Sequence, residues 1–366
     1  MANRPYYREN FVDDKGRLGT AELIGAPDLP RPGDPYTGVN LAEKFAAEIA
    51  NYPNAQAWIK AREQTGDYTG IHVGDWLPLR ANNIDFKATI MGIDTYTGYG
   101  DVVVPHHIDW ILNYLWPGAI SMNPAKFNNG LIPVETINAD GTATTFVLTN
   151  EMNEVASIKS GNTTLTGWTY DADTYTITFE EAPAAGTLTV TGTGTEFPWL
   201  ASNGYHFVNS LAGQVPNGNT LNPPVKHVDY TSSGVYYNLP QEWKDIIIQK
   251  RKYIAKQYSS SGLLTEPNGG GWSNIGYIWL PDENEVYGHS VFATSPYDMI
   301  GSSVQYPLFS SNMNRAKTAS DNSRASYWLM STRSGNSDNW CSVTFYGACF
   351  TFNANGANRL PVCFRT

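Results

Sequence analysis

The chain has 366 residues, enough for about two or three domains with a substantial core. Its formal net charge is -10 and its pI is about 5.1, so it lacks the excess of Lys and Arg that nucleic-acid binding requires. Charged residues make up only 16% of the chain, which is typical of a β- and loop-rich protein whose surface is polar rather than ionic.

Neither a secretory signal nor a membrane anchor is predicted. The first residues, MANRPYYRENFVDDKGR, lack the apolar core of a signal peptide, and no apolar run reaches membrane-spanning length. We therefore expect synthesis in a cytoplasm and no membrane insertion. The three cysteines, Cys341, Cys349 and Cys363, lie near the C-terminus. An odd number predicts small packing residues rather than disulfides, and without a CxxC pair or a His at ligand spacing no metal site is expected.

Residues 1–66 are interpreted as an attachment or oligomerisation segment. After a Pro- and Gly-rich stretch, Asn40 is placed to cap a helix that begins at Leu41, where Phe45 and Ile49 recur at helical spacing. A second short helix is predicted over residues 55–62. These helices are expected to pack against other subunits or against the main domain, and a plain capping helix is an equal alternative.

From residue 67 the pattern changes to strands, in GIHVGDWLPL, FKATIMGIDTY and DVVVPHHIDWI. His106 and His107 invite a metal or acid-base interpretation. Adjacent residues on a strand point to opposite faces, however, so a hydrogen-bonded structural role is favoured. Asp94 and Asp109 are interpreted as turn and cap residues rather than a catalytic pair.

Residues 131–196 form a separate block, in which apolar and Thr residues alternate between turns rich in Asp, Gly and Pro. Several short strands at regular intervals predict a small β-sandwich. The pattern is similar to the immunoglobulin-like modules that decorate phage tail and capsid proteins, so a spacer or glycan-touching module is expected.

The earlier pattern resumes after this block, as if the sandwich were inserted into a larger domain. Helices are predicted over residues 201–211 and 241–258, the second with Trp243 and Ile254 on its apolar face and cations towards its end. The segment YIWLPDENEVYG follows. Its Glu283 and Glu285 are interpreted as hydrogen-bonding scaffold rather than as a general acid.

The C-terminal stretch has the composition of a binding surface. Apolar runs, YWLM at 327–330 and LPVCF at 360–364, predict buried strands. Between them lie Ser, Asn, Gly and Asp with interspersed aromatics, a mixture that suits adaptable binding loops. A hairpin with long loops and inward-packed rings is the alternative. Residues 338–358 contain no Lys, Glu, Gln or Met, which codons that end in a pyrimidine cannot encode. This is the pattern of a segment rewritten from a template of Asn codons, with Trp340 as an exception or a fixed position.

Several motifs together carry a resemblance. VGDWLPL, IDTYTGYGDVVVPHHIDWI, SMNP, PWLAS, YIWLPDENEVYG, SVQYPLF, YWLMS and the terminal RLPVCF resemble a phage-associated family with a C-type-lectin-like fold, found among tail and virion proteins of gut bacteriophages. Some members are variable proteins of diversity-generating retroelements, as is the phage major tropism determinant. The resemblance covers residues 67–130 and 197–366, and it implies an α+β fold with the sandwich at 131–196 as an insertion.

The resemblance implies a receptor-binding adhesin on the virion, diversified by a retroelement, with no enzymatic activity and no cofactor. Its expected partners are a host-surface protein or glycan, other virion proteins and further copies of itself, a trimer being plausible. On a strand over residues 342–346, Ser342, Thr344 and Tyr346 are predicted to face the ligand, and Val343 and Phe345 the core. The full set of expected contact residues is Arg333, Asp338, Asn339, Trp340, Ser342, Thr344, Tyr346, Ala348, Phe350, Phe352, Asn353, Asn355 and Asn358.

Three other functions stay open. One is a virion structural or decoration protein with no specific ligand. Another is a calcium-dependent glycan-binding lectin, since Glu266-Pro267-Asn268 is similar to the sugar-specificity tripeptide of C-type lectins, although acidic calcium ligands do not cluster near it. The third is an enzyme of the formylglycine-generating type, which uses a cysteine pair. Here Cys341 and Cys349 have no cationic neighbour in sequence to activate a thiol.

Overall fold

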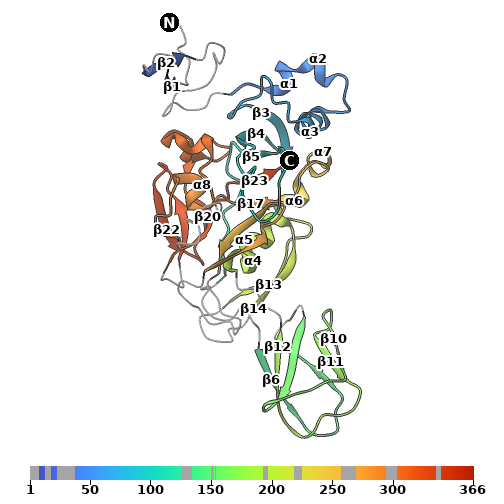
Figure 1. Cartoon of the computed structure of the whole chain (residues 1–366). Coiled ribbons are helices and arrows are strands. Elements are labelled where there is room, and N and C mark those ends of the chain that lie inside the picture. Colours follow the sequence, from blue (N-terminus) through green and yellow to red (C-terminus); the bar gives the residue numbers. More distant parts are fainter. Residues whose placement is uncertain are drawn as a thin grey trace.

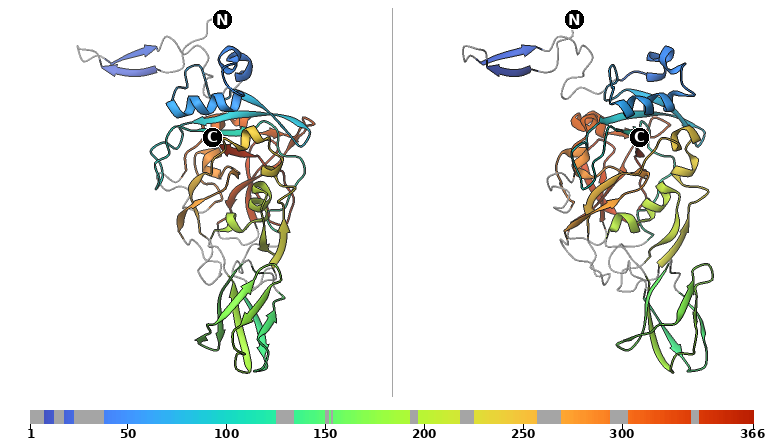
Figure 2. Two further views of the ribbon diagram at one scale, coloured as in Figure 1. Left: turned by 90° about the vertical axis from the view of Figure 1, so that its right-hand side faces the viewer. Right: turned by 45° about the vertical axis from the view of Figure 1, so that its right-hand side comes forward.

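The structure is a computed structural model that describes residues 8–12, 18–22, 38–124, 134–149, 152, 154–192, 197–217, 225–256, 269–293, 303–334 and 339–366. Of residues 8–12, 18–22 and 225 it describes the backbone alone. Strands β1 (Arg8–Val12) and β2 (Leu18–Glu22) form an antiparallel hairpin. In the remainder, a mixed helix and sheet domain lies between the first helices at one end and a small β-module at the other (Figures 1 and 2).

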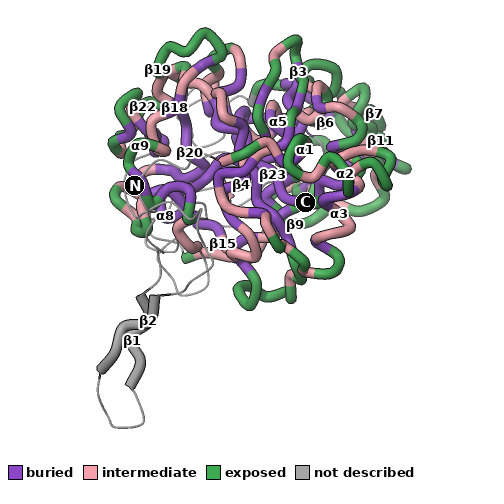
Figure 3. Tube along the Cα trace, turned by 90° about the horizontal axis from the view of Figure 1, so that it is seen from above, coloured by how far each residue is buried: buried purple, intermediate pink, exposed green. Residues whose placement is uncertain are grey.

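The main domain is built on a five-stranded antiparallel sheet in the order β17-β23-β5-β4-β3. Its strands are β3 (Trp76–Ala81), β4 (Ile84–Ile93), β5 (Ile108–Leu112), β17 (Ile278–Trp279) and β23 (Cys363–Arg365). The end of the chain is thus the second strand of the sheet, paired with β5 at Phe364↔Trp110. Seen from above, β4, β20 and β23 lie at the buried centre (Figure 3). This sheet carries part of the strand predicted over LPVCF at 360–364, as β23.

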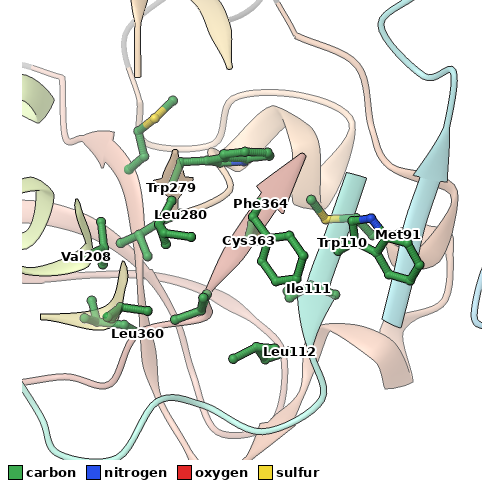
Figure 4. Packing of buried hydrophobic residues seen from close by; sticks show 14 of the residues in the cluster. Met91, Trp110, Ile111, Leu112, Val208, Trp279, Leu280, Leu360, Cys363 and Phe364 are labelled. Atoms are coloured by element: carbon green, nitrogen blue, oxygen red, sulfur yellow. The ribbon is translucent and has the colours of Figure 1, made fainter. Parts of the chain in front are cut away.

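The core of this domain is rich in aromatic side chains. Phe364 lies 6.5 Å from Trp110 and 5.2 Å from Trp243, measured between ring centroids. Figure 4 shows Cys363 and Phe364 of β23 surrounded by side chains of β4, β5 and β17. Aromatic pairs at such distances add about 0.5–1.5 kcal/mol to the free energy gained from burial alone.

The predicted N-terminal helices pack onto this core. Helix α1 (Leu41–Lys44) is capped by Asn40, whose side chain accepts the amide of Ala42 as predicted, and α2 (Ala46–Ile49) and α3 (Ala55–Thr65) follow. Leu41, Trp58 and Ile59 are fully buried in the same cluster as the sheet residues. Residues 38–66 are therefore a structural part of the main domain and not a detached segment.

The predicted β-sandwich block folds as two antiparallel sheets with their own core. One sheet has the order β6-β12-β8-β9 and the other β10-β11-β7. Their bounds are β6 (Val134–Ala139), β7 (Thr145–Val147), β8 (Val155–Ser160), β9 (Thr163–Thr164), β10 (Trp168–Asp171), β11 (Thr176–Phe179) and β12 (Gly186–Gly192). Ile158, Ile177 and Leu188 are fully buried in a cluster separate from that of the main domain. Regular alternation of apolar and Thr residues was sufficient to predict this module.

After the module the chain returns to the main domain through short elements. These are α4 (Pro198–Ala201), α5 (Asn203–Asn209), β13 (Ala212–Pro216), β14 (Val225–Asp229), α6 (Val235–Asn238), α7 (Gln241–Lys244), β15 (Arg251–Ala255), β16 (Gly270–Asn274), α8 (Glu283–Tyr287), η2 (Pro307–Ser310), α9 (Asn312–Arg315), β18 (Lys317–Thr318) and β19 (Arg324–Ala325). The helices α4 and α5 correspond to the helix predicted at 201–211.

The long helix predicted over 241–258 is wrong. Helix α7 ends at Lys244, and β15 pairs with β16 at Tyr253↔Trp272. The prediction failed because it placed the cations of this segment at an exposed helix end. Lys250 and Lys252 are buried and bind carboxylates in the core, with Lys250 Nζ 2.7 Å from Glu285 and Lys252 Nζ 2.5 Å from Asp282. They contact these buried groups instead of facing water at a helix end, so the helical spacing of the apolar residues was misleading.

Candidate ligand-binding face

The predicted binding segment forms a three-stranded antiparallel sheet of β20 (Tyr327–Thr332), β21 (Asn339–Val343) and β22 (Cys349–Asn353), with β21 in the middle. A tight turn joins β21 to β22. The amide of Thr344 donates to the carbonyl of Ala348 at 2.8 Å, and Gly347 has a positive φ of 91°. A Cβ at Gly347 would lie 3.2 Å from the backbone of Asn312 and Ala316, so glycine lets the turn pack closely against α9.

Four aromatic side chains of this hairpin are exposed to solvent, and we call them the aromatic face. They are Phe345 (53% exposed), Tyr346 (59%), Phe350 (52%) and Phe352 (40%). The rings of Phe345 and Tyr346 meet edge to face with centroids 4.8 Å apart. Phe350 and Phe352 are two residues apart on β22 and so share one side of it. A group of exposed aromatic rings such as this one is a feature of interaction surfaces.

The predicted assignment of faces is wrong at the end of β21. Ser342 and Val343 are both buried, and Phe345, predicted to fill the core, is more than half exposed. Buried and exposed side chains do not alternate here, because both sides of β21 are covered and the strand ends at Val343, where the turn begins. Trp340, an expected ligand contact, is fully buried in the main core. Trp340 and Ser342 therefore support the face from within and do not contact a ligand.

The other expected contact residues divide by exposure. Ala348, Asn353 and Asn355 are exposed, as are Tyr346, Phe350 and Phe352. The half-buried ones are Arg333, Asn339, Thr344 and Asn358. Asp338 lies outside the described residues. Sequence reasoning missed two exposed side chains here, Phe345 and Met313 of α9 (62% exposed). The FYG sequence at 345–347 is a turn signal that points to Phe345, whereas nothing in the sequence pointed to Met313.

The buried side chain of Glu283 forms a hydrogen bond to this hairpin. It is fully buried at the start of α8, directly after Asp282, which forms a capping box with Glu285. Its Oε2 accepts backbone amides of Val291, Phe292 and Ala293, each at 2.8 Å. Its Oε1 accepts the thiol of Cys349 on β22 at 2.8 Å. One carboxylate therefore ties residues 291–293 to the strand that carries Phe350 and Phe352.

A network of buried charges includes residues of two neighbouring strands of the central sheet, Asp109 of β5 and Arg365 of β23. Arg365 forms two hydrogen bonds to Asp109, at 2.7 and 2.8 Å, and Tyr306 donates to the same carboxylate at 2.8 Å. Burial alone would raise the pKa of Asp109, but Arg365 and Lys250 outweigh it and hold the pKa far below its usual value. The charges of Asp109 and Arg365 are thus paired with each other, which joins β5 to β23.

A similar pairing joins Lys250 to Glu285, which also accepts the hydroxyl of Tyr96 at 2.6 Å. Burial opposes ionisation of Glu285, yet the neighbouring ammonium groups of Lys250 and Lys252 keep its pKa low. Burial also lowers the pKa of Lys250, to about 8. The hydrogen bonds fit the predicted scaffold role of Glu285, and they explain why Lys250 and Lys252 point inward.

The paired histidines occupy separate structural positions. His107 is buried, with Nδ1 3.0 Å from the carbonyl of Pro105 and Nε2 accepting the amide of Tyr96 at 3.2 Å. Burial lowers its pKa, so the ring is neutral. His106 is partly exposed and its Nδ1 lies 2.7 Å from Asp94. The two rings face different partners, and this geometry matches the predicted hydrogen-bonded role.

The thiols are poorly suited to nucleophilic chemistry. All three are free, and burial is the main cause that raises the pKa of Cys341, Cys349 and Cys363. The nearby carboxylate of Glu283 raises those of Cys341 and Cys349 further, whereas a catalytic thiol needs a cationic neighbour. In the part of the chain that the structure describes, no group of three or more His, Cys, Asp or Glu side chains is arranged to hold a metal ion. The tripeptide Glu266-Pro267-Asn268 lies outside that part.

Among the described residues, no helix is long and apolar enough to cross a membrane. Comparison with protein-family models, with curated proteins and with solved structures found no match to this chain.

Proposed function

We propose that this protein is a phage virion adhesin whose C-type-lectin-like domain binds a molecule on the host surface through the aromatic face. The observation that carries the proposal is the exposure of Phe345, Tyr346, Phe350 and Phe352 on one short hairpin. Exposed aromatic rings beside adaptable amides are the residues that dominate binding energy at recognition surfaces. The phage origin rests on the sequence resemblance.

The rigidity of the underlying sheet supports this function. Trp340 and Ser342 are packed in the core, and Glu283 holds β22 from below, so the rings are presented by a fixed backbone. A preformed surface loses less conformational entropy on binding than a mobile loop. The exposed side chains of the turn and of β22, at Phe345, Tyr346, Phe350 and Phe352, can also vary without loss of the core, which fits diversification by a retroelement. Several copies on one particle, for instance a trimer, would raise a weak affinity by avidity.

The competing function is a virion structural or decoration protein with no specific ligand. The adhesin and the decoration protein are distinguished by a triple variant that replaces the three most exposed rings, Phe345→Ser, Tyr346→Ser and Phe350→Ser. Binding of the labelled chain to a panel of gut bacterial cells is then measured, together with thermal melting. The matched control is the double variant Tyr52→Ser and Tyr237→Ser, whose side chains are 39% and 52% exposed and lie outside the hairpin.

The adhesin proposal predicts that the triple variant loses cell binding by at least about tenfold, because interface hot spots are each worth about 2 kcal/mol or more. Its melting temperature and that of the control stay near the wild-type value, since exposed substitutions change stability by about 0.5 kcal/mol or less each. Unchanged cell binding by the triple variant would favour the decoration protein instead.

A further inference from the structure

Lys252 of β15 reaches a buried site that contains two carboxyl groups. Its Nζ lies 2.5 Å from Oδ2 of Asp282 and 2.8 Å from Oε1 of Glu285. The three residues are at most 1% exposed. The amine and the carboxyl groups are therefore held together where bulk water is excluded, and exclusion of water favours condensation over hydrolysis.

The distance between Lys252 and Asp282 suits attack by the amine on the carboxyl carbon. A carboxyl carbon lies about 1.2 Å from each of its oxygens, so Nζ of Lys252 is within roughly 3.7 Å of Cγ of Asp282. Reacting atoms in productive complexes lie about 3–3.5 Å apart. A bond between the two side chains would join β15 to the residue that caps α8.

The two carboxyl groups beside Lys252 differ in how readily they ionise. Burial raises the pKa of Asp282, although Lys252 opposes this effect. Burial also opposes ionisation of Glu285, but the ammonium groups of Lys250 and Lys252 lower its pKa to about 2. Two acids whose pKa values are pushed apart supply a proton donor and a proton acceptor. Asp282 therefore fits the carboxylic acid that is attacked, and Glu285 fits the base that takes a proton from the amine.

The second oxygen of Asp282 is held by two hydrogen-bond donors. Oδ1 accepts the backbone amide of Glu285 at 2.7 Å, and the hydroxyl of Ser303 donates to it at 3.0 Å. Donors in this position stabilise the negative charge that forms on a carboxyl oxygen when a nucleophile adds to its carbon. Oδ1 would remain as the carbonyl oxygen of an amide, so the cap of α8 would be kept when Oδ2 leaves.

We propose that the side chains of Lys252 and Asp282 form an isopeptide bond once the chain has folded, with Glu285 as the base. The ion pair is the arrangement that precedes this bond. Glu285 takes one proton from the ammonium of Lys252, and the free amine attacks Cγ of Asp282. Oδ2 then leaves as one water, with its own proton and a second proton from Nζ. A C–N bond replaces a C–O bond, the third Nζ proton stays on the amide, and nothing is oxidised or reduced.

The test is mass spectrometry of the purified full chain. The expected intact mass is lower than the mass calculated from the sequence by one water. Trypsin cleaves after Arg251 and Lys256, so the peptide of residues 252–256 should stay joined to the peptide that contains Asp282. An intact mass equal to the calculated one overturns the proposal. A loss of water that leaves the two peptides separate also overturns it, because aspartate can lose water by forming a succinimide.

Three variants test the role of each group, with circular dichroism to establish that each chain is folded. Lys252→Arg should have its full calculated mass, because a guanidinium group stays protonated and is not a nucleophile. Asp282→Asn should still form the bond but lose ammonia instead of water. Glu285→Gln should form the bond at least about a hundredfold more slowly, so chains of full mass accumulate. The matched control is Lys317→Arg, which changes a buried lysine of β18 and should keep the loss of water.

Each variant has a result that contradicts its assigned role. A folded Lys252→Arg chain that still lacks one water overturns the assignment of Lys252, and a folded Asp282→Asn chain that loses water instead of ammonia overturns that of Asp282. A folded Glu285→Gln chain that links as fast as the wild type overturns the role of Glu285. The joined wild-type peptides decide whether the bond exists, even where a variant does not fold.

Discussion

The thiol of Cys349 donates a hydrogen bond to Oε1 of Glu283 across 2.8 Å, which joins the strand of the aromatic face to a buried carboxylate. The other oxygen of Glu283 accepts three consecutive backbone amides, from 291 to 293. A carboxylate so placed satisfies donors that would otherwise be buried without a partner. The presentation of the exposed rings therefore depends on a residue that is itself inaccessible to any ligand.

Replacing Glu283 by Gln should destabilise the main domain by about 2–4 kcal/mol. The amide retains one acceptor oxygen, so either the three backbone donors or the Cys349 thiol faces an NH2 group, and hydrogen bonds to a charged acceptor are worth about 1.5–3 kcal/mol. Urea unfolding followed by tryptophan fluorescence measures the loss. Glu181→Gln, at an exposed position of the β-module, is the control and should change nothing. A Glu283→Gln protein as stable as the wild type would mean that the carboxylate is not needed as an anchor.

The three thiols should resist alkylation in the native protein. The thiolate is the form that attacks N-ethylmaleimide, and burial with a nearby carboxylate raises the pKa of Cys349 and Cys341, while Cys363 is fully buried. Mass spectrometry should find no adduct on the folded chain at neutral pH and three adducts after unfolding in guanidinium. Rapid labelling of Cys349 in the folded state would instead favour the formylglycine-generating type of enzyme.

Glu63 should make the protein less stable as the pH rises from about 4.5 to 7. Burial raises its pKa from 4.5 to about 7, against the opposing effects of Thr366 and Lys60. Within this window the folded state keeps a proton that the unfolded state has lost, so the free energy of unfolding falls as pH rises. A shift of this size corresponds to at most about 3 kcal/mol.

The measurement compares wild type and Glu63→Gln by urea unfolding at pH 4.5 and pH 7.5. The Gln variant cannot lose a proton, so its stability relative to wild type should be higher at pH 7.5 than at pH 4.5. A difference between the two proteins that is the same at both pH values would show that folding does not raise the pKa of Glu63.

Trp340→Ala should cost about 3–5 kcal/mol, because the indole is fully buried in the main core. Phe350→Ala, at an exposed position of β22, should cost about 0.5 kcal/mol or less. Thermal unfolding of the two variants measures the contrast. Equal losses would mean that Phe350 is also a core residue and that the aromatic face is smaller than the exposures indicate.

Much of the fold followed from local patterns. Asn40 as a cap was read from residue type, the strand segments at 70–79 and 86–96 overlap β3 and β4, and the β-module was read from its regular turns. Mixed α and β structure was confirmed in this way. The prediction of a helix at 241–258 was wrong because Lys250 and Lys252 bind Glu285 and Asp282, which lie far away in the sequence and cannot be detected from local spacing.

The candidate face was predicted in outline but not in its detail. The composition of the C-terminal stretch pointed to Tyr346, Phe350 and Phe352, which are exposed. It also pointed to Trp340, which is buried, because composition does not say where a strand ends or whether both its sides are covered. Exposure of Phe345 depends on the turn at Gly347, and packing of that turn depends on α9, which no pattern within the hairpin reveals.

The most direct test of the account is binding of the Phe345→Ser, Tyr346→Ser, Phe350→Ser variant to host cells at a temperature where it and the wild type are both fully folded. The account predicts a loss of at least about tenfold in binding with the melting temperature nearly unchanged. Binding equal to that of the wild type, from a protein that melts at the same temperature, would contradict it.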